Sequence, residues 1–394
     1  MNPAVSPKLT IAELQSNEEL RRHEFPSVCE RVFLAHAGVS PLPRRVAEAL
    51  RDYAVQSSQR DQYSLFGEAR LPKIRELAAQ LIGAQPDEIA FLAPTALALS
   101  VAAAGLPLRK GDNILIYFDD YPANVYPWMA LAEKGVQVRL MNIRDLGKIR
   151  PVDVMGQVDE QTRLVALATN HFLAGFRPDL DAIGKYLHDR NIVFGIDAIQ
   201  TLGAFPIDLK YVDFLAAGGQ KWLLGPCGTG IFYVRKSLQE RLRPTIYGCG
   251  NVRSPDFIAQ EHIVFQPDAR RYEVGTPNLI GLIGLQAALE LLLEVGVENI
   301  AVELLRKRAW LVPALQQKGW TVLQGDAPPA NASGIITFYR AGAEPADMPG
   351  LFKKLREAGI ELSLRADRNG RQHLRISAHF YNTDAELSRL LEFF

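Results

Sequence analysis

Short apolar runs alternate with amphipathic stretches through the middle of the chain. The runs are rich in β-branched residues and predict strands, whereas intervening stretches such as 126–135 and 178–191 have the spacing of amphipathic helices. This alternation predicts βαβ units, a mainly parallel sheet buried on both faces, and ligands near the carboxyl ends of its strands. The predicted strands are 113–118, 136–143, 163–169, 191–197 and 212–217, with a further candidate at 228–235.

The region before these strands is predicted to be helical. Helical spacing is found at 44–56 and 68–84. A third helix is expected over 95–106, with Thr95 as its N-cap because threonine oxygens accept hydrogen bonds from the first helical N–H groups. These helices are expected to belong to the same large domain as the sheet.

The order of the predicted helices and strands changes after about residue 278. Two long helical patterns, 281–296 and 298–319, precede shorter strand and helix patterns, an order that predicts a smaller α+β domain. We therefore expect three parts: an N-terminal segment at 1–30 that packs with the small domain, a large domain at 31–284, and a small C-terminal domain at 285–394.

Composition narrows the classes of partner. Of 394 residues 48% are apolar, and Lys plus Arg equals Asp plus Glu at 44 each, so no basic field marks a nucleic-acid or anionic-membrane partner. Three scattered cysteines make neither a disulfide framework nor a metal site. With no apolar h-region near the start and no run of about eighteen apolar residues, we expect a cytoplasmic protein without a membrane span.

Asp197 and Lys221 both follow predicted strands. If these strands are neighbours, the carboxylate and the amine face one crevice, as required by a cofactor with a pyridinium nitrogen and an aldehyde. Pyridoxal phosphate has both groups. A lone Asp after a strand is nevertheless often a turn residue, and a lone Lys is often a solvated charge, so spacing alone leaves both interpretations open.

The segment that contains these two residues resembles a known family. The segment "IDAIQTLGAFPIDLKYVDFLAAGGQKWLLGPCGTGIFYVR" is similar to the cofactor-lysine region of the class V aminotransferase group of fold-type-I pyridoxal-phosphate enzymes. That group includes cysteine desulfurases, kynureninase and isopenicillin-N epimerase-like proteins. The similarity extends from "FLAHAGVSPLP" to "LRISAHFYNTDAEL". It implies a large domain with a mainly parallel, seven-stranded-type sheet between helices, and a smaller α+β C-terminal domain.

The resemblance assigns residues to the cofactor ring. It implies that Asp197 pairs with the pyridine nitrogen, that Gln200 hydrogen-bonds the ring hydroxyl, and that Lys221 forms the resting Schiff base, an internal aldimine. Tyr121 would stack on the ring. Asn170 would lie near both the ring hydroxyl and the substrate.

The phosphate site departs from the family pattern at two positions. Thr95 and Ala96 would form the cradle at a helix N-terminus, where backbone N–H groups and the macrodipole favour an anion. Pro94 stands where relatives usually have glycine, and Gln220 where many have histidine. Thr276, in "RYEVGTPN", matches the threonine that reaches the phosphate of the neighbouring subunit, so the resemblance implies a homodimer with shared active sites.

Substrate contacts follow from the same resemblance. Arg375 matches the arginine that binds the carboxylate of a small amino-acid substrate, and Ala37 and Gly38 would line the carboxylate side through their backbone. His36 and His171 are candidates without an assigned role. Arg60, Arg253 or Arg365 could favour an acidic substrate, or each could be a solvated charge.

The sequence leaves the reaction open. Cysteine desulfurases carry a nucleophilic cysteine shortly before the carboxylate arginine, and 360–377 contains none, which argues against desulfuration through a protein persulfide. Cys227 is expected to be a small buried residue. The leading interpretation is a class V aminotransferase-type enzyme acting at the α-amino group or α-carbon of a small amino acid. The alternatives are a C–S lyase acting on a cysteine-like substrate, an amino-acid epimerase, and a catalytically inactive protein of the same fold.

Overall fold

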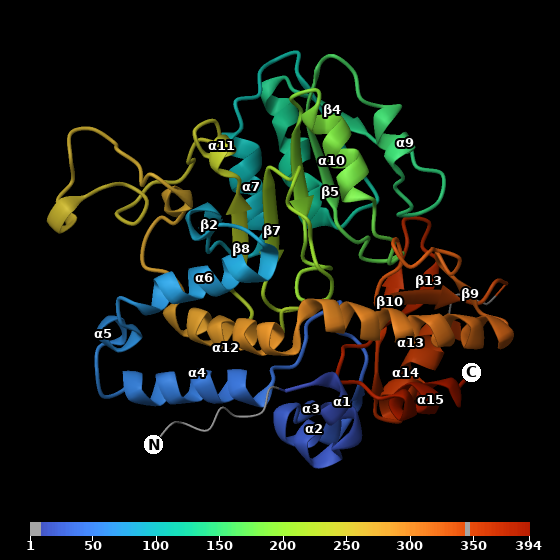
Figure 1. Cartoon of the computed structure of the whole chain (residues 1–394). Helices are drawn as coiled ribbons and strands as arrows, with labels where there is room; N and C mark the ends of the chain where they lie inside the picture. The colour runs from blue at the N-terminus through green and yellow to red at the C-terminus, as the bar shows by residue number, and fades with distance from the viewer. Residues whose placement is uncertain (1–8, 343–346) are drawn as a thin grey trace.

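A seven-stranded sheet forms the centre of the molecule (Figure 1). The structure is a computed structural model and describes residues 9–342 and 347–394. The strand order is β2-β8-β7-β6-β5-β3-β4, and only β8 runs antiparallel to its neighbours. The prediction of a mainly parallel sheet is thus confirmed. The strands are β2 Ile89–Ala90, β3 Asn113–Ile116, β4 Gln137–Leu140, β5 Thr162–Ala168, β6 Val193–Asp197, β7 Phe214–Gly218 and β8 Gly230–Val234.

Helices cover both faces of this sheet. Successive side chains of the central strands enter two different core clusters, because a strand points alternate residues to opposite faces. Ile196 of β6 and Leu215 of β7 belong to one cluster, whereas Val193 and Phe214 belong to the other. The helices of this part are α4 Arg44–Ser57, α5 Gln62–Phe66, α6 Arg70–Ile82, α7 Thr95–Gly105, α8 Tyr126–Met129, α9 Pro151–Met155, α10 Leu180–His188 and α11 Lys236–Gln239.

Two local predictions are wrong. Pro94 is the N-cap of α7 and Thr95 is its first helical residue, because the Thr95 side chain accepts a hydrogen bond from the backbone of Gly218 instead of capping the helix. The stretch 126–135 is not one helix: α8 ends at Met129 and a 3₁₀ helix, Ala130–Lys134, follows.

Two long helices lead from the large sheet to a second one. Helix α12, Leu279–Val295, contacts α4 and α6, and α13, Val297–Gln317, continues after a bend of 73° at Gly296. No single helix among the described residues is both long and apolar enough to cross a membrane; only this bent pair reaches that length and composition together. The expected domain boundary near residue 285 falls within α12, and the division into domains stays a prediction.

The second sheet is antiparallel and has the order β12-β13-β10-β9. Strands β12 and β13 form a hairpin in which Ser363 lies opposite Arg375. A further parallel pair, β1 with β11, brings Val32 beside Ile360. The elements are β1 Val32–Phe33, β9 Thr321–Val322, β10 Ile335–Tyr339, β11 Ile360–Glu361, β12 Ser363–Ala366, β13 Gln372–Ser377, α14 Asp347–Glu357 and α15 Asp384–Leu391.

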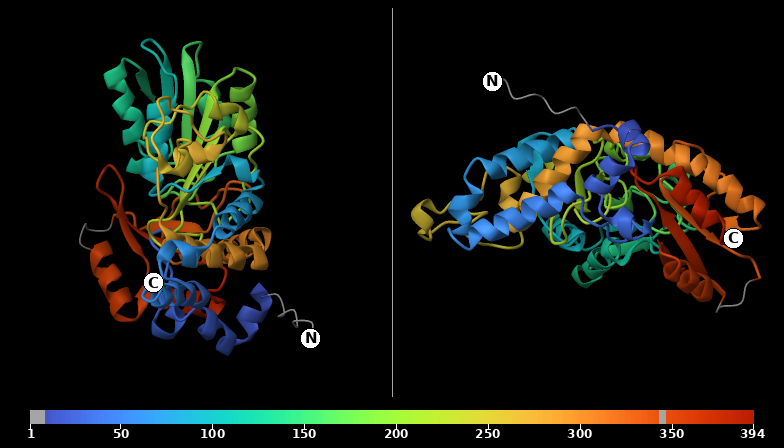
Figure 2. Two further views of the ribbon diagram at one scale, coloured as in Figure 1. Left: turned by 90° about the vertical axis from the view of Figure 1, so that its left-hand side faces the viewer. Right: turned by 90° about the horizontal axis from the view of Figure 1, so that it is seen from below.

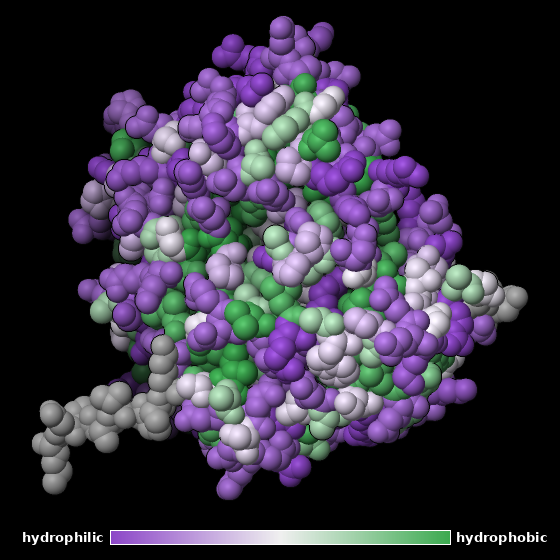
Figure 3. All heavy atoms as spheres, turned by 45° about the vertical axis from the view of Figure 1, so that its right-hand side comes forward, coloured by the Kyte–Doolittle hydropathy of each residue, from purple (hydrophilic) through white to green (hydrophobic). Residues whose placement is uncertain are grey.

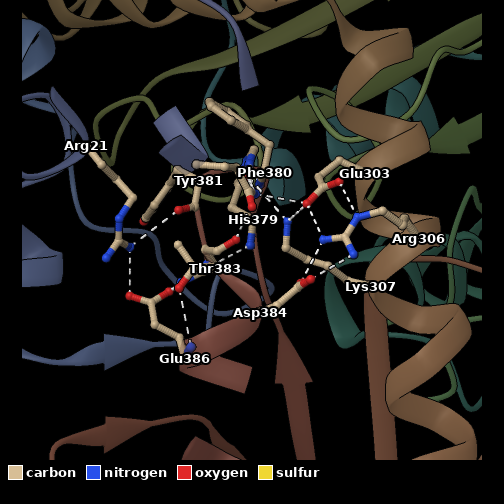
Figure 4. Close-up of polar contacts among 12 residues, drawn as sticks. Arg21, Glu303, Arg306, Lys307, His379, Phe380, Tyr381, Thr383, Asp384 and Glu386 are labelled. Atoms are coloured by element: carbon tan, nitrogen blue, oxygen red, sulfur yellow. Dashed lines mark hydrogen bonds and ion pairs between the residues drawn. The ribbon is translucent and has the colours of Figure 1, made fainter. Parts of the chain in front are cut away.

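A network of ion pairs ties the N-terminal helices to the C-terminal part of the chain (Figure 4). Arg21 pairs with Glu386 at 2.8 Å, and Glu303 of α13 bonds both Arg306 and the buried Lys307. The N-terminal helices are α1 Ile11–Ser16, α2 Glu18–Glu24 and α3 Ser27–Glu30.

One segment projects from the rest of the molecule. It lies between α11 and α12, contains residues 247–266, and is yellow to light orange in Figures 1 and 2. It exposes Phe257 (86%), Ile258 (64%) and Ile263 (61%). On the face shown in Figure 3, by contrast, hydrophilic side chains dominate the outer surface and hydrophobic ones gather toward the centre.

Candidate active site

A pocket of about 470 Å³ lies at the carboxyl ends of β6 and β7. It brings together every residue expected at the site from the sequence except Asn170 and Thr276. Those expected residues that line it are Ala37, Thr95, Ala96, Tyr121, Asp197, Gln200, Gln220, Lys221 and Arg375. The location agrees with the rule that ligands of parallel sheets bind beyond the carboxyl ends of the strands.

Asp197 is a buried carboxylate at the floor of this pocket. It is the last residue of β6, flanked by Ala168 of β5 and Ala216 of β7, and is 2% exposed. Its Oδ1 accepts a hydrogen bond from Ile199 N at 3.0 Å. Burial raises the pKa of the carboxyl, and within the described residues no basic side chain forms an ion pair with it. A cationic ring nitrogen is the partner that such a carboxylate requires, so the site fits a pyridinium.

Lys221 reaches the same pocket from a glycine turn that follows β7. A Cβ on Gly219 would lie 2.3 Å from Thr229 Oγ1, so a larger residue there would displace Thr229, whereas one on Gly218, the last residue of β7, would meet only the end of the Gln220 side chain. The lysine is 8% exposed and its Nζ lies 5.2 Å from the centre of the Tyr121 ring. Burial lowers the pKa of the amine, which favours the neutral form that attacks an aldehyde or accepts a proton.

The N-terminus of α7 lines the same pocket through Thr95 and Ala96. The N–H groups of Leu97 and Ala98 bond Pro94 O, whereas those of Thr95 and Ala96, as the first of the helix, have no intrahelical acceptor. Free N–H groups at a positive helix end suit a phosphate. This end of the site therefore fits the phosphate of the cofactor.

Arg375 lies on β13 with its guanidinium in the pocket. It is 1% exposed; Nη1 donates to Phe172 O at 2.6 Å and Nη2 to Ser363 Oγ at 3.5 Å. Its Nε is buried and has no hydrogen-bond partner among the described residues. Burial lowers the pKa of Arg375 to about 9, and nearby Arg365 adds to that effect. A guanidinium with an unused donor and no carboxylate partner fits a substrate carboxylate.

Asn170 and Thr276 lie outside the pocket lining. Asn170 follows β5 and donates from Nδ2 to Gln200 O at 3.1 Å, and its buried Oδ1 has no partner in the part of the chain that the structure describes. Thr276 lines a different pocket of about 180 Å³, together with Gly228 and Pro277. The structure therefore places Asn170 behind Gln200, and a role for Thr276 at a phosphate depends on a second subunit.

The backbone of Ala37 lines the pocket but offers no free donor. Its N–H donates to Ser377 Oγ at 2.9 Å and its carbonyl accepts from Gln200 Nε2 at 3.0 Å. The N–H of Gly38 likewise bonds Ala35 O. A substrate carboxylate would thus depend on Arg375 rather than on this turn.

The two unassigned histidines are neutral and fully hydrogen-bonded. His171 donates from Nε2 to Asp119 O and accepts at Nδ1 from Ala174 N. His36 donates from Nδ1 to Ser377 O and accepts at Nε2 from the Tyr381 hydroxyl at 2.6 Å. Burial lowers the pKa of each to about 4. Neither ring has a nitrogen left for catalysis, so both hold the structure of their turns.

The sequence interpretation missed part of the lining. Phe172 contributes the carbonyl that accepts from Arg375 and a ring 5.5 Å from that of Tyr121. Arg365, left undecided above, lines the pocket; it stands two residues beyond Ser363 on β12 and so shares a face with Arg375. The two-residue spacing in "SLR" was the signal that could have identified it. Val39, Ala123 and Ile199 also line the pocket.

The β12–β13 hairpin holds no cysteine and is tied to the large sheet. At its turn Arg368 forms an ion pair with Asp119 and lies 3.9 Å from the centre of the Phe118 ring. None of the three cysteines lines the pocket. The expectation that Cys227 is buried is wrong, because it lies exposed in the glycine-rich turn before β8.

Comparison with known proteins agrees with this geometry. The family model described as Aminotransferase class-V matches residues 32–390. A probable cysteine desulfurase of Methanothermobacter thermautotrophicus is 30% identical over 391 residues, covering 95% of this chain and 96% of the relative. Cysteine desulfurase CsdA of Escherichia coli is 29% identical over 394 residues, covering 94% and 95%.

Solved structures match over nearly the whole chain. The crystal structure of Escherichia coli CsdA has a TM-score of 0.82 at 25% identity and covers 98% of this chain and 97% of that one. An apo cysteine desulfurase from Thermococcus onnurineus NA1 has a TM-score of 0.84 at 22% identity, covering 94% and 95%, and shares the fold. The chain therefore belongs to the class V aminotransferase family of enzymes, which have the type I fold and use pyridoxal phosphate.

Proposed function

We propose that the protein is a C–S lyase that eliminates sulfur from a cysteine-like amino acid without passing it to a cysteine of its own. The observation that carries the proposal is the pocket itself. It places the Lys221 amine and the Arg375 guanidinium together, and it contains no thiol to receive sulfur. The resemblance to cysteine desulfurases supports C–S cleavage, and the cysteine-free hairpin supports release of the sulfur as a small molecule.

The residues divide the elimination among them. When bound, pyridoxal phosphate supplies an aldehyde that condenses with amines and a ring that accepts electrons from the α-carbon. Arg375 holds the α-carboxylate, Asp197 holds the proton on the pyridine nitrogen, and Lys221 Nζ takes the α-proton. The Cβ–S bond then breaks with its electron pair on sulfur, and the Lys221 ammonium returns a proton to the thiolate. Cysteine and water thus yield pyruvate, ammonia and hydrogen sulfide, with no net oxidation.

Transamination is the competing reaction for this site. It uses the same lysine and arginine, and an uncharacterized aminotransferase of Bacillus subtilis is 29% identical over 380 residues. Transamination, however, transfers the amino group to an oxo acid and releases no sulfide. The products therefore separate the two proposals.

Product analysis of a cysteine-free variant tests the proposed function. The triple variant carries Cys29→Ser, Cys227→Ser and Cys249→Ser. We expect both wild-type enzyme and this variant to release pyruvate, ammonia and sulfide from cysteine in equal amounts. The rates of the two enzymes should agree within about twofold, because all three thiols are exposed outside the pocket. Release of alanine with sulfur held on the protein, and its loss in the triple variant, would instead establish a persulfide relay. Formation of an oxo acid that keeps its sulfur, only in the presence of an amino acceptor, would establish transamination.

We also propose that the active enzyme is a homodimer. The projecting segment 247–266 exposes apolar side chains that a second copy would cover, and Thr276 lies outside the pocket of its own chain. In a two-fold assembly Thr276 of one chain would bind the cofactor phosphate of the other.

Subunit mixing tests the dimer. Lys221→Ala removes the reactive amine of a chain and Thr276→Val removes the hydroxyl that it would lend to its partner. Co-expression of the two variants is expected to restore about a quarter of wild-type activity, because about half of the dimers are mixed and one of the two sites in each mixed dimer receives both native residues. Separately purified variants, kept unmixed, serve as the baseline. A mixed sample that is no more active than the sum of the separate variants would contradict a shared site.

A further inference from the structure

The side-chain amide of Gln200 is held in one orientation by two groups of fixed character. Trp222 Nε1, which can only donate, lies 3.0 Å from Gln200 Oε1. The carbonyl of Ala37, which can only accept, lies 3.0 Å from Gln200 Nε2. A flipped amide would place two donors together at one end and two acceptors at the other. The neighbours therefore fix which end of the amide is the donor.

Trp222 is itself fixed by its surroundings. It is fully buried, and its carbonyl accepts a hydrogen bond from His379 Nε2 at 3.1 Å. His379 follows β13 and belongs to the loop shown in Figure 4, where its Nδ1 accepts from Phe380 N. A Cβ on Gly334 would lie 3.0 Å from the indole Cη2 of Trp222, so a glycine provides the space for the ring. The position of Trp222 is thus fixed by a hydrogen bond to its carbonyl and by close packing around its ring.

We propose that Trp222 is a positioning residue, which fixes Gln200 so that an amide N–H faces the ring hydroxyl of bound pyridoxal phosphate. Gln200 lines the pocket, and only one of the two hydrogens on its Nε2 is used by Ala37. The second hydrogen is available to a cofactor oxygen. This inference rests on the proposed placement of the cofactor ring between Asp197 and Lys221.

The orientation matters because a donor and an acceptor have opposite effects on a phenolic oxygen. An N–H group stabilises the oxygen in its anionic form, whereas a carbonyl in the same place would favour its protonated form. Without the indole N–H, the Gln200 amide loses the partner of its oxygen and can rotate. The acid–base behaviour of the bound cofactor should then change even though Trp222 does not touch it.

The test is a pH titration of the visible absorption of the holoenzyme carrying Trp222→Phe. Phenylalanine keeps an aromatic ring but lacks the indole N–H donor and part of the ring volume, and the double-mutant cycle described below separates the two losses. We expect the midpoint of the spectral transition to rise by about half to one pH unit, since one hydrogen bond to the anionic oxygen is weakened. Tyr272→Phe is the matched control, because Tyr272 is also fully buried and its hydroxyl donates to Leu242 O away from the pocket. An unchanged midpoint in Trp222→Phe would overturn the inference.

A double-mutant cycle separates positioning from a general loss of packing. If Trp222 acts through Gln200, the variant Gln200→Ala should shift the midpoint, and adding Trp222→Phe should shift it no further. An additional shift in the double variant would show that Trp222 acts by another route.

If Trp222→Phe does not fold, Gln200→Glu keeps the indole bond but replaces the donor by an acceptor, and must raise the midpoint for the inference to stand. A wild-type band that titrates normally while the enzyme releases no sulfide would refute the proposed function and leave this inference intact.

Discussion

Lys221→Ala is expected to abolish turnover, with a loss of at least about 1,000-fold in kcat, since one amine serves as both cofactor anchor and proton acceptor. The lysine is the only amine that lines the described pocket. Its burial lowers the pKa of the amine and keeps it available as a base. Steady-state rates of sulfide release, measured at saturating cysteine, report the loss directly.

Spectroscopy and a surface control complete this experiment. The variant should still take up pyridoxal phosphate through Asp197 and the α7 N-terminus, but the band of the lysine-bound cofactor should be absent. Lys236→Ala is the control, because Lys236 is exposed and pairs with Asp87 on the surface. Turnover by Lys221→Ala within tenfold of wild type would exclude Lys221 as the catalytic base.

Arg375→Lys is expected to lower kcat/KM for cysteine about 100-fold, mainly through KM. Lysine keeps the positive charge but loses the fork that bonds a carboxylate twice, and hydrogen bonds between charged groups are worth about 1.5–3 kcal/mol each. The unpartnered Nε and the burial of the guanidinium make this loss larger than at a solvated arginine. Measurement of kcat and KM separately, together with the affinity for a cysteine analogue without its carboxylate, checks the assignment.

The matched control for this substitution is Arg308→Lys. Arg308 is also buried, has its pKa lowered to about 10 by burial, and donates to Ile335 O and Gln324 O away from the pocket. Both substitutions should cost folding stability, but only Arg375→Lys should raise KM. If Arg375→Lys prefers cysteine over the analogue without a carboxylate as strongly as wild-type enzyme does, the substrate carboxylate binds to a group other than Arg375.

The sequence predicted the sheet well because its strands are nearly continuous apolar runs. Burial on both faces of β6 and β7 leaves few alternatives to a strand in "NIVFGID" and "VDFLAA", so the positions of Asp197 and Lys221 followed from local pattern. The sequence could not show that Thr95 fails to cap α7, since the donor that occupies its hydroxyl, Gly218 N, is 123 residues away in the chain. Long-range contacts of this kind override local preferences.

The same limit applies to the candidate site. Motifs indicated which residue types gather around the cofactor, but not that both backbone groups of Ala37 are already bonded or that Trp222 holds Gln200. The absence of a thiolate-stabilising neighbourhood around Cys227 predicts a small buried residue, yet its turn lies on the surface. Whether a turn residue faces the solvent or the core depends on packing against residues that are distant in the sequence.

The cysteine-free hairpin, fastened by Arg368 to Asp119, has a consequence for the surroundings in which the enzyme can work. A relay thiol must be emptied by a reductant or an acceptor after every cycle, and it is destroyed by oxidation beyond the sulfenic state. An enzyme that holds no sulfur between cycles needs no such reductant or acceptor. Under the proposed function, reagents that alkylate or oxidise thiols would modify only cysteines outside the pocket, and turnover would continue under oxidative conditions that inactivate a thiol-dependent relative.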